Sequence, residues 1–226
     1  MNKNTTAIIF DFNGVLLWDA EQHKEAWNIM AVKLRNTPFT DEELAEHMYG
    51  RVNRDIIAYL LRRAPTPKET AVFIEEKESM YRAIQQKRGS AFALSPGAIP
   101  FLDVLKEQNI PRTIATSSEI VNVRFFFAHL DLARWFSFED VVYDDGVRNG
   151  KPAPDIYLAA AEHIGIIPQQ CMVIEDASSG IAAAHAAEIG RIIALGPAER
   201  HAALAALPGV DDVITTLAEI NINELL

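Results

Sequence analysis

Polar side chains gather at four places in this sequence, after short apolar runs or in a loop that leads into a helix-length segment. They are Asp11 and Asn13 in FDFNG, Thr116, Ser117 and Ser118 in TIATSS, Lys151 in NGKPAPD, and Glu175 and Asp176 in VIED. Ser, Thr and Asp at such positions are often helix N-caps. Together, however, the four groups supply what phosphoryl transfer needs: a nucleophile, cations that neutralise the phosphoryl oxygens, and hydrogen-bond donors aimed at those oxygens.

Each residue type has a direct use in that reaction. Asp11 can attack phosphorus as a carboxylate. Glu175 and Asp176 offer the hard oxygen ligands that Mg²⁺ prefers. Lys151 is a fixed positive charge, and Thr116 can donate a hydroxyl hydrogen bond. A zinc site is not indicated because the six His are scattered and there is one Cys, and no Gly-rich loop ending in Lys-Ser/Thr occurs.

The apolar runs near these groups predict the strands of a parallel sheet. Continuous apolar runs without polar alternation are typical of strands buried on both faces, and helix-length segments separate them here. The runs cover residues 7–10, 113–115, 141–143, 172–174, 191–194 and 213–214. If the sheet is parallel, the polar side chains meet at one edge of it.

The stretch from residue 18 to about residue 92 predicts helices only. Thr40 with Glu43, and Thr66 with Glu69, are capping-box starts, the second with Pro at the first helical position. A helical insertion after the first strand lies where open parallel sheets bind ligands, so we expect a lid. The expected domains are a core of residues 1–17 and 93–226 and a helical domain of residues 18–92.

Composition and charge exclude several functions. The 226 residues are 49% hydrophobic with no low-complexity run, which predicts a compact soluble protein with no obligate protein partner evident. No stretch approaches the roughly 20 apolar residues of a membrane span, and the start does not read as a signal peptide, so a cytoplasmic location is expected. The formal net charge of -10 argues against nonspecific nucleic-acid binding. An anionic substrate would therefore need a metal or a local cluster of cations.

Four segments in order resemble the motifs of the haloacid dehalogenase superfamily. They are IIFDFNGVLL, TIATSS, GKPAPDIYLAAAEHIG and VIEDASSGIAAAHAA. The resemblance covers nearly the whole chain and is greatest to the β-phosphoglucomutase and sugar-phosphatase group. It implies an α/β fold, a Rossmann-like parallel sheet flanked by helices, with an inserted all-α, four-helix cap. It also implies an aspartyl-phosphate intermediate and Mg²⁺ held by the Asp11 side chain, the Asn13 backbone carbonyl, and Asp176 with or near Glu175.

The same resemblance implies a set of substrate contacts in the cap and in the second motif. They are His23, Trp27, Gly50, Asn53, Arg54, Lys77, Ser117 and Ser118. Simpler interpretations exist for two of them: His23 as a core histidine with one hydrogen bond, and Lys77 as a packed stem with its charge in solvent. Arg54 is favoured for substrate because Arg grips phosphate bidentately. Asp19 is expected on a solvated face.

Two positions depart from the group's pattern. Glu119 follows Ser118 where the mutase has a basic residue that helps hold a second phosphate, and a carboxylate there would repel a bisphosphate. Asn13 replaces the usual second Asp, which protonates the leaving oxygen and later activates water, a contribution of roughly 10²- to 10⁴-fold. Asn13 cannot transfer that proton, although its backbone carbonyl is kept for the metal.

Several explanations of Asn13 are open. The protein could be a slow phosphatase that uses His23 or water as proton carrier, or an enzyme for a substrate whose leaving group needs no proton. It could also be a protein that binds a phosphorylated ligand without turnover. Finally, Asn13 could have been introduced deliberately by engineering. Deamidation at Asn13-Gly14 is a further hypothesis. The sequence favours a Mg²⁺-dependent phosphatase acting on a small phosphorylated metabolite, such as a sugar phosphate, through an aspartyl phosphate on Asp11. The alternatives are a β-phosphoglucomutase-like phosphotransferase or a catalytically impaired phosphate-ligand binding protein.

Overall fold

The computed structural model describes residues 5–221. The chain divides into two compact units, one of residues Met1–Trp18 with Leu94–Leu226 and one of residues Asp19–Ala93. The first, the core unit, contains the sheet, and the second, the helical unit, contains helices only. Within residues 5–221 no helix is both long enough and apolar enough to cross a membrane.

The sheet of the core unit is fully parallel in the described residues and has the order β3-β2-β1-β4-β5-β6. Its strands are β1 (Ala7–Phe10), β2 (Arg112–Glu119), β3 (Val142–Asp144), β4 (Cys171–Glu175), β5 (Arg191–Leu195) and β6 (Asp212–Ile214). The chain builds outward from β1 to β3 and then returns to β4 on the other side of β1. This reversal is the point at which open α/β sheets bind ligands, at the carboxyl ends of the strands. The predicted α/β class is confirmed.

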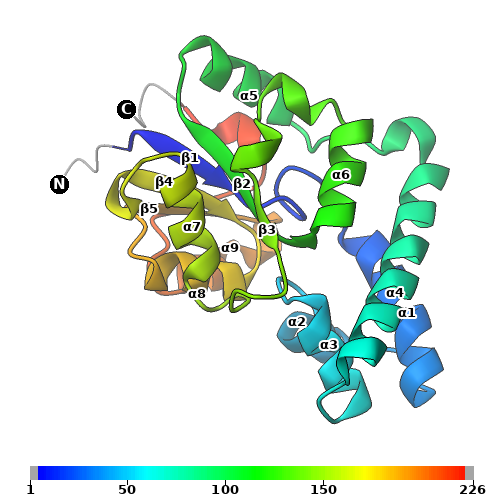
Figure 1. Ribbon diagram of the computed structural model, residues 1–226. Coiled ribbons are helices and arrows are strands. Elements are labelled where there is room, and N and C mark those ends of the chain that lie inside the picture. The colour runs from blue at the N-terminus through cyan, green and yellow to red at the C-terminus, as the bar shows by residue number, and fades with distance from the viewer. Residues whose placement is uncertain (1–4, 222–226) are drawn as a thin grey trace. The chain divides into compact units, whose positions relative to one another are not determined.

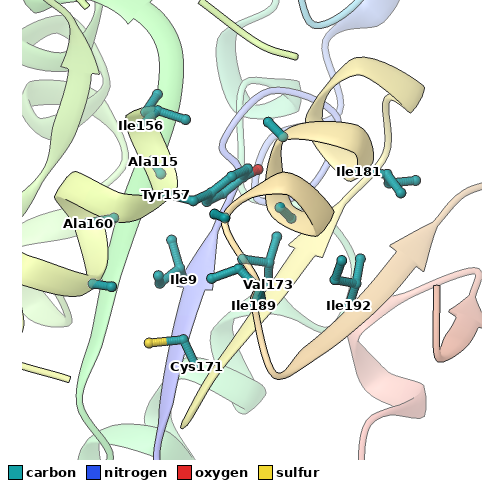
Figure 2. Packing of buried hydrophobic residues seen from close by; sticks show 14 of the residues in the cluster. Ile9, Ala115, Ile156, Tyr157, Ala160, Cys171, Val173, Ile181, Ile189 and Ile192 are labelled. Carbon is teal, nitrogen blue, oxygen red and sulfur yellow. The ribbon is translucent and has the colours of Figure 1, made fainter. Parts of the chain in front are cut away.

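Helices cover both faces of the sheet (Figure 1). They are α5 (Ala98–Glu107), α6 (Ile120–His129), α7 (Asp155–His163), α8 (Ser178–Ala186) and α9 (His201–Ala205). Successive β1 side chains point to opposite faces. Ile9 belongs to a buried cluster that also includes Tyr157 of α7 and Ile181 of α8 (Figure 2). Phe10 instead contacts Phe101 of α5 edge to face. Burial on both faces explains why β1 and β4 are apolar throughout.

Strand β2 is longer than its apolar residues suggest. The run 113–115 predicts a strand that ends before the hydroxyl residues, but β2 continues to Glu119 and pairs there with Asp144 of β3. The register between β2 and β3 shifts between Ala115 and Glu119. Thr116, Ser117 and Ser118 therefore lie within the irregular last part of a strand.

The helical unit contains α1 (Ala20–Arg35), α2 (Asp41–His47), α3 (Asn53–Leu61) and α4 (Pro67–Lys87). The capping boxes predicted at Thr40 with Glu43 and at Thr66 with Glu69 are both formed. An apolar cluster that includes Trp27 joins these helices. The four-helix insertion follows β1 in the chain, as expected from the sequence.

A half-buried ion pair between Arg35 and Glu43 joins α1 to α2 and makes the stability of the helical unit depend on pH. The Arg35 guanidinium donates to both carboxylate oxygens of Glu43 at 2.7 Å, and the Tyr59 hydroxyl donates to the same carboxylate. The Arg35 and Tyr59 hydrogen bonds lower the pKa of Glu43 from 4.5 to about 2. The stabilisation of the folded state by this ion pair is therefore complete above 4.5, the ordinary pKa of Glu43. It is lost as the pH falls toward 2.

We predict that Glu43→Gln lowers the free energy of unfolding by about 1 kcal/mol at pH 7, because the pair is partly solvent-screened. The cost should shrink as the pH falls from 4.5 toward 2. Urea unfolding at several pH values measures it. A cost that is the same at every pH would contradict this origin.

Candidate active site

Asp11, Lys151 and Glu175 form one buried charge cluster at the carboxyl edge of the sheet. Asp11 follows β1, and its backbone N–H donates to the Ile174 carbonyl of β4 at 3.0 Å. Glu175 is the last residue of β4. The Lys151 Nζ donates to Asp11 Oδ1 at 2.6 Å and to Glu175 Oε1 at 2.5 Å, and Lys151 is only 2% exposed. Three segments far apart in the sequence thus meet through one ammonium.

The charge of Lys151 is fixed by this arrangement. Burial by itself lowers the pKa of a lysine, but the charges of Asp11 and Glu175 outweigh it and hold the pKa of Lys151 well above its usual value. Lys151 is therefore a permanent cation that orients the Asp11 carboxylate.

Glu175 is held from several sides. Its Oε1 also accepts from the Tyr157 hydroxyl at 2.9 Å, and its Oε2 accepts from the Ala177 backbone N–H at 2.9 Å. A side chain at Gly180 would place its Cβ 1.6 Å from Glu175 Oε1, so only Gly fits beneath the carboxylate. Glu175 therefore anchors Lys151 as well as contributing charge.

Asp176 completes a three-carboxylate cluster. Oxygen atoms of Asp11, Glu175 and Asp176 lie within 4.8 Å of one another. The Asp176 carboxylate rests against the backbone of Gly14, where an added Cβ would lie 2.2 Å from Oδ2. Burial and the charges of Glu175 and Asp11 raise the pKa of Asp176 well above its usual value. Three carboxylates with one ammonium leave a negative excess of the kind that a hard divalent cation neutralises, so the donor set fits Mg²⁺.

Asn13 lies in a tight turn whose shape depends on Gly14. Gly14 has φ of 91° and donates its backbone N–H to the Leu17 carbonyl at 2.7 Å, and the Leu17 N–H donates to the Phe12 carbonyl at 3.0 Å. The positive φ is one that Gly adopts without strain. The turn brings the backbone of residues 13 and 14 beside the carboxylate cluster.

The Asn13 side chain is oriented by the second motif. Its Oδ1 accepts from the Ser118 hydroxyl at 2.8 Å and from the Thr116 hydroxyl at 3.4 Å, and the Ser118 backbone N–H donates to Thr116 Oγ1 at 3.1 Å. The structure therefore joins Thr116 and Ser118 to Asn13. The Ser117 Oγ is also buried, without a hydrogen-bond partner among the described residues.

These contacts oppose the deamidation hypothesis. Deamidation requires the Gly14 backbone nitrogen to attack the Asn13 side-chain carbon. That nitrogen is hydrogen-bonded to Leu17, and the Asn13 amide oxygen is held by Ser118. Both reacting groups are thus restrained by hydrogen bonds to other residues.

In the helical unit, Lys77 is buried in a polar network. Lys77 is 1% exposed, so the interpretation with its charge in solvent is wrong. Its Nζ contacts His23 Nδ1 at 2.9 Å and donates to Glu78 Oε1 at 2.8 Å, and Asn53 Nδ2 donates to the same Glu78 oxygen at 2.8 Å. The Trp27 ring lies 5.2 Å from the Lys77 ammonium. Four of the predicted substrate residues therefore share one site.

The network continues through residues that the sequence reading missed. Asp19 is 1% exposed, which corrects the expectation of a solvated face. It accepts from the Tyr81 hydroxyl and lies 3.3 Å from His23 Nε2, while Tyr81 stacks on the His23 ring. Because an ammonium only donates, His23 Nδ1 accepts from Lys77 and Nε2 carries the hydrogen that faces Asp19. Asp19 and His23 lie four residues apart at the start of a helix, and this spacing could have predicted their contact.

Among the described residues, no hydrogen bond or ion pair joins the Arg54 side chain to Lys77. The Arg54 side chain is 46% exposed and lies 3.5 Å from Asp55 in the first turn of α3. Gly50 has φ of 69°, as a turn before that helix requires. The substrate roles of Arg54 and Gly50 stay predictions.

Comparison with known proteins gives the family. The haloacid dehalogenase-like hydrolase family matches residues 5–188. A phosphorylated carbohydrates phosphatase of Thermotoga maritima is 28% identical over 224 residues, 95% of this chain and 99% of that protein. The fructose-1-phosphate phosphatase YqaB of Escherichia coli is 32% identical over 196 residues, 83% of this chain and 95% of that protein.

The fold of a solved relative agrees with this. The crystal structure of a HAD hydrolase, family IA, variant 3, from Entamoeba histolytica has a TM-score of 0.87 and 36% identity, covering 98% of this chain and 97% of that one. The relatives of this chain include both sugar phosphatases and β-phosphoglucomutases. The chain therefore belongs to the haloacid dehalogenase-like hydrolases, in their phosphoglucomutase-like group, and is an enzyme of the phosphatase type.

Proposed function

We propose that the chain hydrolyses the phosphate monoester of a small metabolite, such as a sugar phosphate, through an aspartyl phosphate on Asp11. The observation that carries this proposal is the Asp11 carboxylate, oriented by Lys151 beside Glu175 and Asp176. A carboxylate held this way presents one oxygen to an incoming phosphorus while its other oxygen is bound to the ammonium. The names of the related phosphatases support a sugar phosphate as the substrate class.

Mg²⁺ is the proposed cofactor, held by the Asp11 and Asp176 side chains, with Glu175 beside them, and by the Asn13 backbone carbonyl. When bound, the ion would neutralise phosphoryl oxygens during transfer. Lys151 then keeps Asp11 in its attacking orientation. Thr116 and Ser117 supply hydroxyl donors at the same edge, and the buried, unpartnered Ser117 Oγ is suited to a phosphoryl oxygen.

The helical unit is proposed to hold the rest of the substrate. Two of the three Lys77 ammonium hydrogens face His23 and Glu78, which leaves one for a substrate oxygen. Asn53 and Trp27 border the same ammonium, and Arg54, Gly50 and Ser118 complete the proposed contact set.

A monophosphate is favoured over a bisphosphate. Glu119 ends β2, is partly exposed and pairs in register with Asp144, so two acidic residues flank that end of the sheet. A second phosphate placed there would meet negative charge. The mutase reaction, which handles two phosphates, is therefore the less favoured alternative.

The proposal is tested by phosphate release from a panel of sugar phosphates, measured with Mg²⁺ and again with a chelator. We expect slow release that requires Mg²⁺ and that Asp11→Asn lowers by more than about 10³-fold. The Asn side chain has nearly the same shape, so circular dichroism and thermal unfolding should show that this variant remains folded.

Equal release by the chain and by Asp11→Asn would contradict the nucleophile assignment. Binding of sugar phosphates with no release by the chain or by Asn13→Asp would instead identify a phosphate-ligand binding protein.

A further inference from the structure

The family resemblance places Asn13 at the position of a general acid and base, and hydrogen bonds hold its side chain in one orientation. Its amide oxygen accepts from the Ser118 and Thr116 hydroxyls. An amide exchanges no proton in such a reaction, and its hydrogen-bonded oxygen fixes the side chain in place.

Two neighbouring proton donors of the core unit, Lys151 and Tyr157, direct their protons to carboxylates. The Lys151 ammonium is bound between Asp11 and Glu175, and the Tyr157 hydroxyl donates to Glu175. In the helical unit, both ring nitrogens of His23 are engaged, by Lys77 and by Asp19. This opposes the earlier hypothesis that His23 carries the missing proton.

The nature of the leaving group then decides which substrates react. An alcohol that departs from phosphorus needs a proton, because its anion is about as basic as hydroxide, the base of water with a pKa of about 15.7. A carboxylate has a pKa of about 4 and departs as a stable anion. The absence of an acid at position 13 therefore penalises phosphate monoesters and leaves acyl phosphates unaffected.

We propose that Asp11 takes phosphoryl groups from acyl phosphates, and that the aspartyl phosphate so formed is long-lived because Asn13 cannot activate water. This rests on the proposed function, since it uses Asp11 as the nucleophile. An Asp11 oxygen forms a bond to phosphorus, and the bond from phosphorus to the acyl oxygen breaks. The electron pair stays on that oxygen, which leaves as a carboxylate with no proton added.

The second half of the reaction is the one that stalls. A water that attacks the aspartyl phosphate must lose a proton as its oxygen bonds to phosphorus, and Asp11 departs as a carboxylate. The resemblance implies that the acceptor for that proton is the Asp that Asn13 replaces, a contribution of roughly 10²- to 10⁴-fold. The chain thus stores a phosphoryl group where an Asp at position 13 would release it.

The test uses acetyl phosphate as the probe. The chain is incubated with acetyl phosphate and Mg²⁺, excess reagent is removed, and intact mass is followed over time. We expect one phosphoryl adduct, which peptide mapping places on Asp11 and which hydroxylamine removes. Asp11→Asn should show no adduct, and in Asn13→Asp the adduct should decay at least about 10²-fold faster. A sugar phosphate should label the chain much more slowly than acetyl phosphate does.

The result that overturns the proposal is distinct from failure of the proposed function. If the chain acquires no adduct on Asp11, or loses it as fast as Asn13→Asp does, the proposal is wrong, even where Asn13→Asp hydrolyses sugar phosphates. A stable Asp11 adduct supports the proposal even where neither protein hydrolyses a monoester, and then it is the phosphatase assignment that fails.

Discussion

Asn13→Asp is expected to raise the turnover of sugar phosphates by about 10²- to 10⁴-fold, the usual contribution of a general acid and base. The new carboxyl group would occupy the place of the amide, with one oxygen accepting from the Ser118 and Thr116 hydroxyls as the Asn13 oxygen does now. Its second oxygen would replace the amide nitrogen and could carry the proton. The site therefore already holds the contacts that orient an Asp.

The measurement is steady-state phosphate release with Mg²⁺ and a sugar phosphate at saturating concentration. Asn109→Asp is the matched control, because it makes the same charge change at an exposed position before β2, at the opposite edge of the sheet. That control should leave turnover unchanged. An Asn13→Asp variant that is folded but no faster on any monoester would show that proton transfer does not limit this enzyme.

Lys151→Met is expected to lower the free energy of unfolding by about 3–5 kcal/mol in the absence of divalent cations. Met keeps most of the length of the side chain but removes the ammonium that contacts both Asp11 and Glu175. Those carboxylates would then be buried near Asp176 without that counter-charge. Turnover should fall as well, because the orientation of Asp11 is lost.

Urea unfolding with and without Mg²⁺ measures this cost. Mg²⁺ should restore part of the stability, because it supplies positive charge to the same carboxylates. Lys106→Met, at an exposed position of α5, is the control and should cost less than about 0.5 kcal/mol. If Lys151→Met lowered the free energy of unfolding no more than Lys106→Met, the Lys151 ammonium would not be needed to stabilise the buried carboxylates.

The core of the fold and much of the site could be predicted because their signals are local. The apolar runs at residues 7–10 and 172–174 predict buried parallel strands, and β1 and β4 occupy them. Adjacent parallel strands end at the same edge of a sheet. The proximity of Asp11 and Glu175 could therefore be predicted from the two strands alone. Lys151 could be identified as a candidate cation, but local patterns could not show that it contacts Asp11 from a loop 140 residues away.

The helical unit shows what local patterns could not predict. Charged residues are usually exposed, but Asp19 and Lys77 are buried because each has polar partners inside the helical unit. The Tyr81 hydroxyl that satisfies Asp19 lies 62 residues away in sequence. The extension of β2 to Glu119 was missed for a similar reason, since its pairing with β3 is a tertiary contact.

We infer that proton transfer is the step missing at Asn13, and the dependence of turnover on the acidity of the leaving group distinguishes this from other causes of slow turnover. Turnover of a series of aryl phosphates, whose phenols range from acidic to weakly acidic, is measured for the chain and for Asn13→Asp. We predict that the rate of the chain falls steeply as the phenol becomes less acidic, that Asn13→Asp shows a shallow dependence, and that the two rates converge for the most acidic phenol. Equal slopes for the two proteins would contradict the account.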